Sequence, residues 1–328
     1  MARKYQVGQR QRGWPIWLSI LVIVVLLVGA GALSLFALKS VKESDKNEGF
    51  STTKAASVEQ ISAETTEEAA EEVSAEISES EETSAEQALL PLVAPQRQIA
   101  QFANLAVRSQ VGTCTDPGTL EISTDGGQAW SASESFAATT ATQVLRLIPV
   151  STSNIFVVAL NADCEPRIYG TADQGATWQQ PVSAVGTWYL DPSNPTQLPA
   201  PGGAKAISCE AISIAPRTNS NVDALCADGS LTSTSDGGAT WSDPVAGDGV
   251  LNVAHSNSDR LLITQSPDQC SGVQLSANVP VAEGATCVHA ELGESDAGQI
   301  AATQFGDSIL AWVGETQFIS KDGGQTWQ

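Results

Sequence analysis

Four aspartates of this sequence occur in one short phrase that is repeated along the chain. The phrase reads Ser/Thr-x-Asp-x-Gly-x-Thr/Ala-Trp, and a carboxylate that recurs in this way could mark a repeated metal or catalytic site. The same residue types also suit a tight turn, because the hydroxyl and the carboxylate exchange hydrogen bonds, the second glycine adopts a positive φ, and the tryptophan buries apolar surface. Since nothing in the phrase requires a ligand, we expect a structural role. The recurring residues are Ser123, Asp125, Gly127, Trp130, Thr171, Asp173, Gly175, Trp178, Thr234, Asp236, Gly238, Trp241, Ser320, Asp322, Gly324 and Trp327.

The other reactive side chains do not form a recognisable catalytic or metal motif. No Cys-x-x-Cys or Cys/His cluster is present, and His255 and His289 are far apart in the sequence, so we expect no zinc site. We predict no catalytic residue, no metal ligand and no cofactor. The net charge of −21 argues against a nucleic-acid partner, because an acidic surface repels phosphates.

The amino-terminal part has the composition of a membrane anchor. Residues 14–38 contain no charged residue and are long enough to span the hydrocarbon core as a helix. The basic residues of the tail, 1–13, predict that the amino terminus stays in the cytoplasm and that the rest of the chain is exported. A cleaved signal peptide is the alternative, since Ala30-Gly31-Ala32 resembles a cleavage site. The length of the apolar run favours a single-pass anchor in the cell membrane.

Residues 39–87 are rich in Glu, Ser, Thr and Ala and contain almost nothing that could be buried. Such a segment cannot offset the entropy of its own ordering, so we expect a disordered acidic stalk. A calcium-binding tract is the alternative interpretation. The composition favours a solvated spacer that lifts a folded domain off the membrane.

The spacing of the tryptophans that end the phrase predicts the architecture of residues 88–328. The interval is 48 residues from Trp130 to Trp178, 63 to Trp241 and 86 to Trp327. The last interval is about twice the length of one unit and therefore contains a unit without the phrase. The interval of 63 contains an insertion rich in Pro and Gly. Strand-rich units of 40–50 residues are typical of propeller blades, so we predict an all-β domain, a β-propeller of about five four-stranded blades.

The last predicted unit lacks its fourth strand, because the sequence ends at Gln328. An unpaired strand edge is a liability. Residues 88–94 form an apolar run directly before the first unit, and we expect them to supply the missing outer strand and close the ring. The alternative is a ring that continues beyond the sequence.

All six cysteines lie in the predicted exported domain, where an even number favours disulfides. In the alignment of the blades, each cysteine has a plausible partner on an adjacent strand, across one turn or in the neighbouring unit. The predicted disulfides are Cys209–Cys226 on adjacent strands of the third unit, Cys270–Cys287 beside the degenerate turn of the fourth, and Cys114–Cys164 at matching positions of the first two.

The repeated phrase resembles the Asp box, or BNR repeat, of sialidases, sortilin-type receptors and photosystem II assembly factors. The resemblance covers roughly residues 98–328. In that family the box lies at the periphery of the blade and is structural, so the resemblance implies no catalytic or metal role for the four aspartates.

Two functions fit these observations. The first is a membrane-anchored, extracytoplasmic module that binds a protein or glycan partner without catalysis. Trp188 and Tyr189 in the insertion, and Phe136, are our candidate interaction residues, because aromatic side chains on polar loops often dominate binding. Packing of the insertion onto its blade is the alternative.

The second function is a sialidase-like glycoside hydrolase that acts on cell-surface or extracellular glycans. The resemblance implies that such an enzyme needs an arginine triad, a Tyr/Glu nucleophile pair and an aspartate acid/base. No arginine here stands in the family's Arg-Ile-Pro context, and tyrosine is nearly absent. Arg146, on a predicted innermost strand, could face the channel, but alone it favours a salt bridge or solvation. We therefore expect a protein that is not an enzyme.

Overall fold

The computed structural model describes residues 89–256, 259–277 and 285–328. The predicted anchor at 14–38 and the predicted stalk at 39–87 lie outside these residues. Within the described part, no helix has the length and hydrophobicity needed to cross a membrane. The regular elements of the described residues are nearly all strands, with one short helix, α2 (Glu134–Ala137), and one 3-10 turn, η1 (Glu294–Asp296).

Five antiparallel sheets, which we call blades 1 to 5, follow one another along the chain, and each contains consecutive strands in sequence order. Blade 1 comprises β1 (Arg97–Phe102), β2 (Leu105–Gly112), β3 (Pro117–Ser123) and β4 (Ser131–Ala132). Blade 2 comprises β5 (Ala141–Pro149), β6 (Ile155–Asn161), β7 (Pro166–Thr171) and β8 (Val182–Ser183). Blade 3 comprises β11 (Ala211–Pro216), β12 (Val222–Cys226), β13 (Ser230–Thr234) and β14 (Val245–Ala246). Blade 4 comprises β15 (Val250–His255), β16 (Arg260–Thr264), β17 (Gly272–Ser276) and β18 (Thr286–His289). Blade 5 comprises β19 (Ile300–Phe305), β20 (Ser308–Val313) and β21 (Thr316–Ser320).

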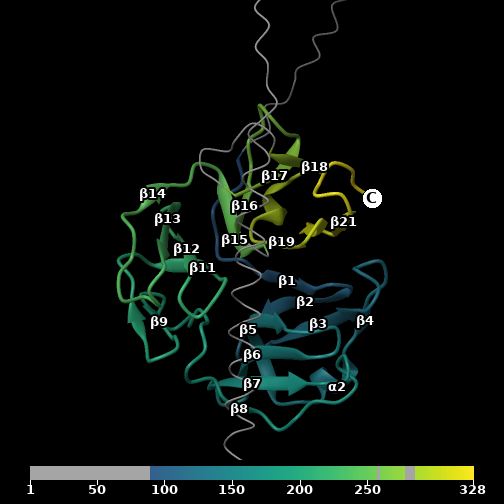
Figure 1. The fold of residues 1–328 in the computed structure, drawn as a ribbon, viewed down its shortest axis with the longest axis vertical. Helices are drawn as coiled ribbons and strands as arrows, with labels where there is room; N and C mark the ends of the chain where they lie inside the picture. Colours follow the sequence, from purple (N-terminus) through teal and green to yellow (C-terminus); the bar gives the residue numbers. More distant parts are fainter. Residues whose placement is uncertain (1–88, 257–258, 278–284) are drawn as a thin grey trace, which may run out of the picture. The chain divides into compact units, whose positions relative to one another are not determined.

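The first strand of each blade lies toward the centre of a ring. β1 packs against β19 and β5, and β15 packs against β11 and β19. Figure 1 shows the five sheets arranged around this centre, with blade 1 beside blade 5. The prediction of an all-β, five-bladed propeller is therefore confirmed, including a fourth blade that has lost the repeated phrase.

The second strands of blades 2 to 5 are buried along most of their length, which explains their largely apolar sequences. In β6, Ile155, Val157 and Val158 are fully buried, and in β12 every residue is buried. A strand with one solvated face would alternate between apolar and polar residues. The hydrophobic core consists of wedges between neighbouring blades rather than one central cluster.

The insertion between blades 2 and 3 fills the gap between them and contains the short strands β9 (Gln197–Leu198) and β10 (Lys205–Ala206). Trp188 is 1% exposed and donates from Nε1 to the carbonyl of Asn219 at 2.9 Å. Tyr189 is 6% exposed and packs against blade 2. Neither side chain is available to a partner, so their assignment as an interaction loop is wrong, and the alternative of packing onto the blades holds. Phe136 is also buried, at 3%, between Tyr169 and Trp178.

Residues 89–95 form no strand and pair with no strand of blade 5, so the predicted closing strand at 88–94 is wrong. The reason lies in the outer strands of blades 1 to 3, which have only two residues and begin shortly after the repeated phrase. In blade 5, Gln328 already takes this position, because its N–H and its carbonyl both bond to the backbone of Ile319.

The apolar run before β1 instead forms an extended strap across one end of the ring. Leu90 packs into the wedge between blades 4 and 5 and donates its backbone N–H to Oε1 of Gln265 at 2.7 Å. Leu92 packs against the wedge between blades 3 and 4. The hydrophobicity that suggested a strand therefore serves to cover blade ends.

Blades 1 and 5 are joined by side chains, without a shared strand. The guanidinium carbons of Arg97 and Arg108 lie 4.2 and 4.6 Å from the ring centroid of Trp312 on β20. Arg108 also lies over Trp130 of blade 1, at 4.4 Å. Gln101 donates from Nε2 to the carbonyl of Ser308 at 2.8 Å. This stack of guanidinium and indole groups, which we call the seam, closes the ring.

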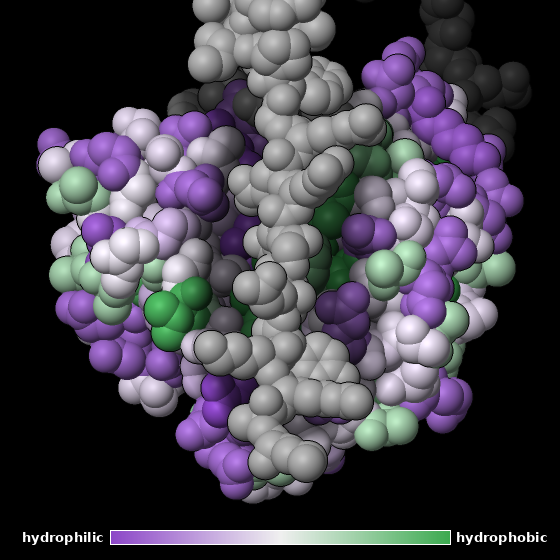
Figure 2. Space-filling view, turned by 60° about the horizontal axis from the view of Figure 1, so that its bottom comes forward, coloured by the Kyte–Doolittle hydropathy of each residue, from purple (hydrophilic) through white to green (hydrophobic). Residues whose placement is uncertain are grey.

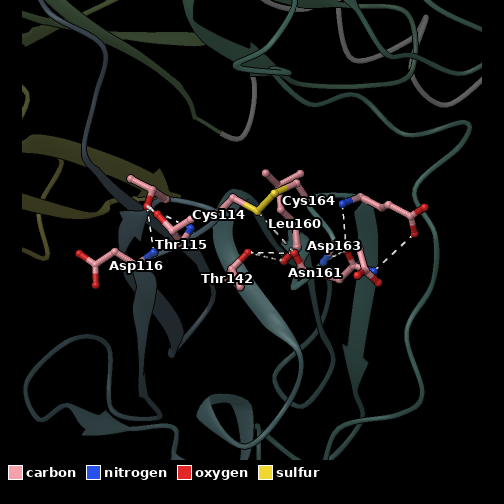
Figure 3. The surroundings of a disulfide bond; sticks show 10 residues. Cys114, Thr115, Asp116, Thr142, Leu160, Asn161, Asp163 and Cys164 are labelled. Carbon is pink, nitrogen blue, oxygen red and sulfur yellow. Dashed lines mark hydrogen bonds between the residues drawn. A yellow bond between two sulfur atoms is a disulfide. The ribbon is translucent and has the colours of Figure 1, made fainter.

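The three predicted disulfides are confirmed. Their Cα atoms are 5.6 Å apart in Cys114–Cys164, 5.8 Å in Cys209–Cys226 and 5.7 Å in Cys270–Cys287. Cys114–Cys164 links the β2–β3 loop of blade 1 to the β6–β7 loop of blade 2, as Figure 3 shows, whereas the other two each lie within or beside a single blade. All three lie toward the end of the ring where the innermost strands begin, which is also the end crossed by the strap.

Candidate functional site

The four repeated phrases form nearly identical turns at the opposite end of the ring. In blade 2, Thr171 Oγ1 donates to Asp173 Oδ1 at 2.7 Å and accepts the backbone N–H of Gly175 at 3.0 Å. Thr177 donates its backbone N–H to Asp173 Oδ1 and its hydroxyl to Oδ2, at 2.9 and 2.6 Å. The same bonds from the hydroxyl residue and the glycine recur around Asp125, Asp236 and Asp322.

These turns use their carboxylate oxygens internally, which supports the structural role expected of them. In the described part of the chain, the one group of His, Cys and acidic side chains close enough to hold a metal ion is Cys270, Cys287 and His289, and both of its sulfur atoms are in a disulfide. No box aspartate belongs to that group. In each box the carboxylate is hydrogen-bonded within its own turn.

The glycine two residues after the box aspartate also fits three of the blades to their neighbours. A Cβ added to Gly175 would lie 2.2 Å from Cδ1 of Ile122 in blade 1. A Cβ on Gly127 would meet Leu310 of blade 5, and one on Gly324 would meet Thr286 of blade 4. All three have positive φ, so both the turn and the close approach require glycine.

Acidification should weaken the boxes in a narrow pH range. Hydrogen bonds from Thr177, Thr240 and Thr326 lower the pKa of Asp173, Asp236 and Asp322 to about 2. Because these values lie below that of an aspartate in the unfolded chain, roughly 4, the stabilisation is complete above pH ~4 and is lost as the pH falls toward 2. We expect the free energy of unfolding to fall over this range, and Asp173→Asn to flatten the fall, as measured by urea denaturation at successive pH values.

The matched variant for this experiment is Asp125→Asn. Blade 1 has Ala129 where the other boxes have threonine, so the pKa of Asp125 is lowered chiefly by the backbone N–H of Ala129, without a hydroxyl donor at that position. Asp125→Asn should flatten the pH dependence less than Asp173→Asn. Equal slopes for both variants and the wild type would contradict the assignment.

The innermost strands of all five blades surround a cavity of about 210 Å³. Ala94 and Pro95 of the strap and Leu190 and Pro192 of the insertion add to its wall. No Asp, Glu, His, Tyr, Cys or Lys occurs among the described residues that line it. The polar side chains in the lining are Arg97, Gln98, Gln143, Arg146, Ser213, Asn252 and Thr303.

Several of these polar side chains hold neighbouring blades together. Gln98 donates from Nε2 to the carbonyl of Val144 at 3.3 Å, between blades 1 and 2. Asn252 accepts from the hydroxyl of Ser213 at 2.7 Å and donates to the carbonyl of Ile300 at 2.9 Å, which connects blades 3, 4 and 5. The cavity therefore has a mostly apolar lining with a few polar groups held in place, as ligand pockets do.

Arg146 is the cation of this wall that has no carboxylate partner among the described residues. Its Nη1 donates to the carbonyl of Trp188 at 3.0 Å and its Nη2 to the carbonyl of Pro216 at 3.2 Å. Burial lowers the pKa of Arg146 to about 10, so it remains protonated at neutral pH. Arg97, by contrast, is 3% exposed and binds Glu315 at 2.7 Å.

Sequence reasoning found Arg146 but missed the rest of this wall. Gln98, Arg146 and Ser213 occupy equivalent positions of β1, β5 and β11, as the strand registers show. In each of these blades, the hydroxyl residue of the box ends the third strand and is paired with a residue of the second strand, which is paired in turn with a residue of the first strand. The wall residue lies three positions before that residue of the first strand. Counting back from the boxes in the sequence could therefore have identified these three wall residues. Leu190 and Pro192 carry no comparable signal.

The face shown in Figure 2 carries a mixture of hydrophilic residues and residues of intermediate hydropathy, with hydrophobic residues in small patches and inside a recess. The protein as a whole has a net charge of −21. A cavity that contains guanidinium groups and no carboxylate side chain in its described lining thus differs in charge from the protein around it.

Comparison with known proteins identifies the repeat. The model of the BNR/Asp-box repeat matches residues 318–328. A comparison with curated proteins finds no match. Among solved structures, YCF48 from Cyanidioschyzon merolae is similar at 18% identity over 70% of this chain and 67% of its own, with a TM-score of 0.27. AofleA from Arthrobotrys oligospora is similar at 13% identity over 73% and 86%, with a TM-score of 0.46.

The fucose-specific lectin from Aleuria aurantia is similar at 11% identity over 74% of this chain and 96% of its own, with a TM-score of 0.41. Together, the repeat matched at 318–328, the four box turns and the five sheets describe a five-bladed β-propeller that carries a BNR/Asp-box repeat.

Proposed function

We propose that this chain is a non-catalytic binding module that holds a protein or glycan partner at the central cavity of the propeller. The observation that carries the proposal is the lining of the cavity. All five blades supply wall residues, and several supply hydrogen-bonding groups, whereas the described lining contains no pair of carboxyl groups such as glycoside hydrolysis generally uses. A concave site with a few convergent polar groups is the usual form of a ligand site.

We further propose that residues 14–38 anchor the chain in the cell membrane, with the amino terminus in the cytoplasm, and that residues 39–87 hold the propeller outside it. The uninterrupted apolar run supports the anchor. The three disulfides support an extracytoplasmic propeller, because disulfides persist in oxidising compartments.

The sialidase-like alternative lacks a comparable observation. Such an enzyme would need three converging arginines, and among the described residues only Arg97 and Arg146 line the cavity. Arg97 is already paired with Glu315. Release of a fluorogenic sialoside by the purified full chain in detergent would overturn the non-catalytic assignment.

A site-specific crosslinking experiment tests the binding site. Pro192 is exposed and lines the cavity, so a photoreactive amino acid placed there should capture the partner on intact membranes. The same group at Ala162, exposed on the β6–β7 loop, is the matched control. Capture at position 192 should also be lost when Gln143→Trp fills the cavity. Equal capture at both positions, or capture that Gln143→Trp leaves unchanged, would contradict the proposal. A peptide and α-methyl fucoside, the ligand types named for similar solved structures, are suitable first competitors.

A further inference from the structure

Five of the six arginines in the described part of the chain form ion pairs with carboxylates. Arg146 is the exception. The pairs are Arg97–Glu315, Arg108–Glu121, Arg167–Glu165, Arg217–Asp223 and Arg260–Asp223. In so acidic a protein a carboxylate partner is easy to supply, and the lack of one at Arg146 within the described residues calls for an explanation.

The contacts of Arg146 leave more than half of its donors unused. A guanidinium carries five N–H groups in a planar fork. The carbonyls of Trp188 and Pro216 accept from Nη1 and Nη2, and the described residues provide no further partner. The side chain is half-buried and lines the cavity.

Clamping the insertion to blade 3 does not by itself account for a charge at this position. A neutral amide could donate the same two bonds to carbonyls without the cost of removing a cation from water. Neutral carbonyls do not compensate that charge, and buried charges in proteins are normally paired. The acidic surface is a diffuse counter-charge that salt screens. An anion bound in the cavity would provide the localised negative charge that the described residues do not place beside Arg146.

We infer that Arg146 binds the carboxylate of a ligand that occupies the central cavity. This inference rests on the proposed function and names the chemistry of the ligand. A carboxylate matches the flat fork of a guanidinium and can accept two parallel hydrogen bonds from it. A single negative charge also balances the one uncompensated cation, because Arg97 is neutralised by Glu315. A doubly charged phosphate would add an unmatched negative charge to an already acidic protein. Gln143 lies in the same wall and offers a neutral amide to the rest of the ligand.

The first test uses acetate as the simplest carboxylate and acetamide as its neutral counterpart. The side-chain Nε resonance of Arg146 is followed by NMR in the full chain in detergent, with Arg146→Lys used to assign it and sodium chloride used to match ionic strength. We expect acetate to shift this resonance saturably, acetamide to leave it unchanged, and Arg167 to show no saturable response. The inference is overturned if acetate and chloride have the same effect on Arg146, or if acetate and acetamide do.

A charge-removing variant gives the matched comparison. Arg146→Gln keeps a donor but removes the cation, and should weaken acetate binding roughly tenfold or more, the effect of losing a charge-assisted hydrogen bond. Arg167→Gln makes the same change on β7, away from the cavity lining, and should leave binding unchanged. Equal weakening by both variants would contradict the inference. If Arg146→Gln does not fold, the wild-type comparison of acetate with acetamide decides alone.

A carboxylate can belong to a sugar acid or to a peptide carboxyl terminus. Glucuronate with its methyl ester, and an acetylated dipeptide acid with its amide, separate the two sources, and the acid that binds more tightly than acetate identifies the ligand class. The outcomes also separate this inference from the proposed function. If position 192 captures a partner but acetate does not bind, the inference about Arg146 is overturned and the proposed function stands. If acetate binds but no partner is captured, the proposed function is contradicted and the inference about Arg146 stands.

Discussion

Replacing Cys114 and Cys164 with serine is expected to lower the free energy of unfolding by about 4 kcal/mol. This disulfide spans 50 residues and is the one that ties two blades together, so its loss releases the largest loop in the unfolded chain. Urea denaturation of the oxidised full chain, followed by tryptophan fluorescence, measures the change. The midpoint should fall without a large change in the slope.

The double variant of Cys209 and Cys226 is the control for this result. That disulfide spans 17 residues inside blade 3, and the same chain-entropy argument gives about 3 kcal/mol. A loss at Cys114–Cys164 that is clearly smaller than the loss at Cys209–Cys226 would show that strain or residual structure, rather than loop closure, sets the contribution of the inter-blade bond.

Trp312→Ala is expected to lower the free energy of unfolding by about 3–5 kcal/mol, the range for removal of a buried aromatic side chain. Trp312 is 6% exposed and carries a guanidinium group from Arg97 and another from Arg108 over its ring. Truncation opens a cavity in the seam and removes both stacking interactions. The same denaturation assay reports the loss.

Trp312→Phe is the matched variant, since it keeps an aromatic face for both guanidinium groups and should be less destabilising than alanine. A double-mutant cycle with Arg108→Ala isolates the stacking interaction, which we expect to contribute roughly 0.5–2 kcal/mol. A loss below about 1 kcal/mol for Trp312→Ala would mean that the seam does not hold the ring closed.

The features that sequence predicted well are those set by local chemistry. The box turns follow from a hydroxyl, a carboxylate and a glycine within five residues, and their spacing was enough to find blade 4 without a box. The cysteine pairs followed once the blades were aligned, because residues on adjacent strands, or at matching positions of neighbouring blades, lie close in space.

The features that sequence missed depend on contacts between distant segments. Trp188 and Tyr189 look exposed in a polar, Pro-rich insertion, but the wide gap between blades 2 and 3 buries them. Residues 88–94 look like a strand, but Gln328 already occupies the outer position of blade 5. Arg146 could be placed on an innermost strand, whereas its lack of a carboxylate partner depends on the insertion and on blade 3, which no local pattern encodes.

The two ends of the ring differ in the kind of bond that secures them. All three disulfides lie toward the end crossed by the strap, and the four box turns, held by hydrogen bonds to carboxylates, lie at the other. A reducing agent therefore attacks one end of the propeller and acid attacks the other. Resistance to each kind of chemical stress can be tuned separately in this fold, by changing cysteines on one end or box threonines on the other.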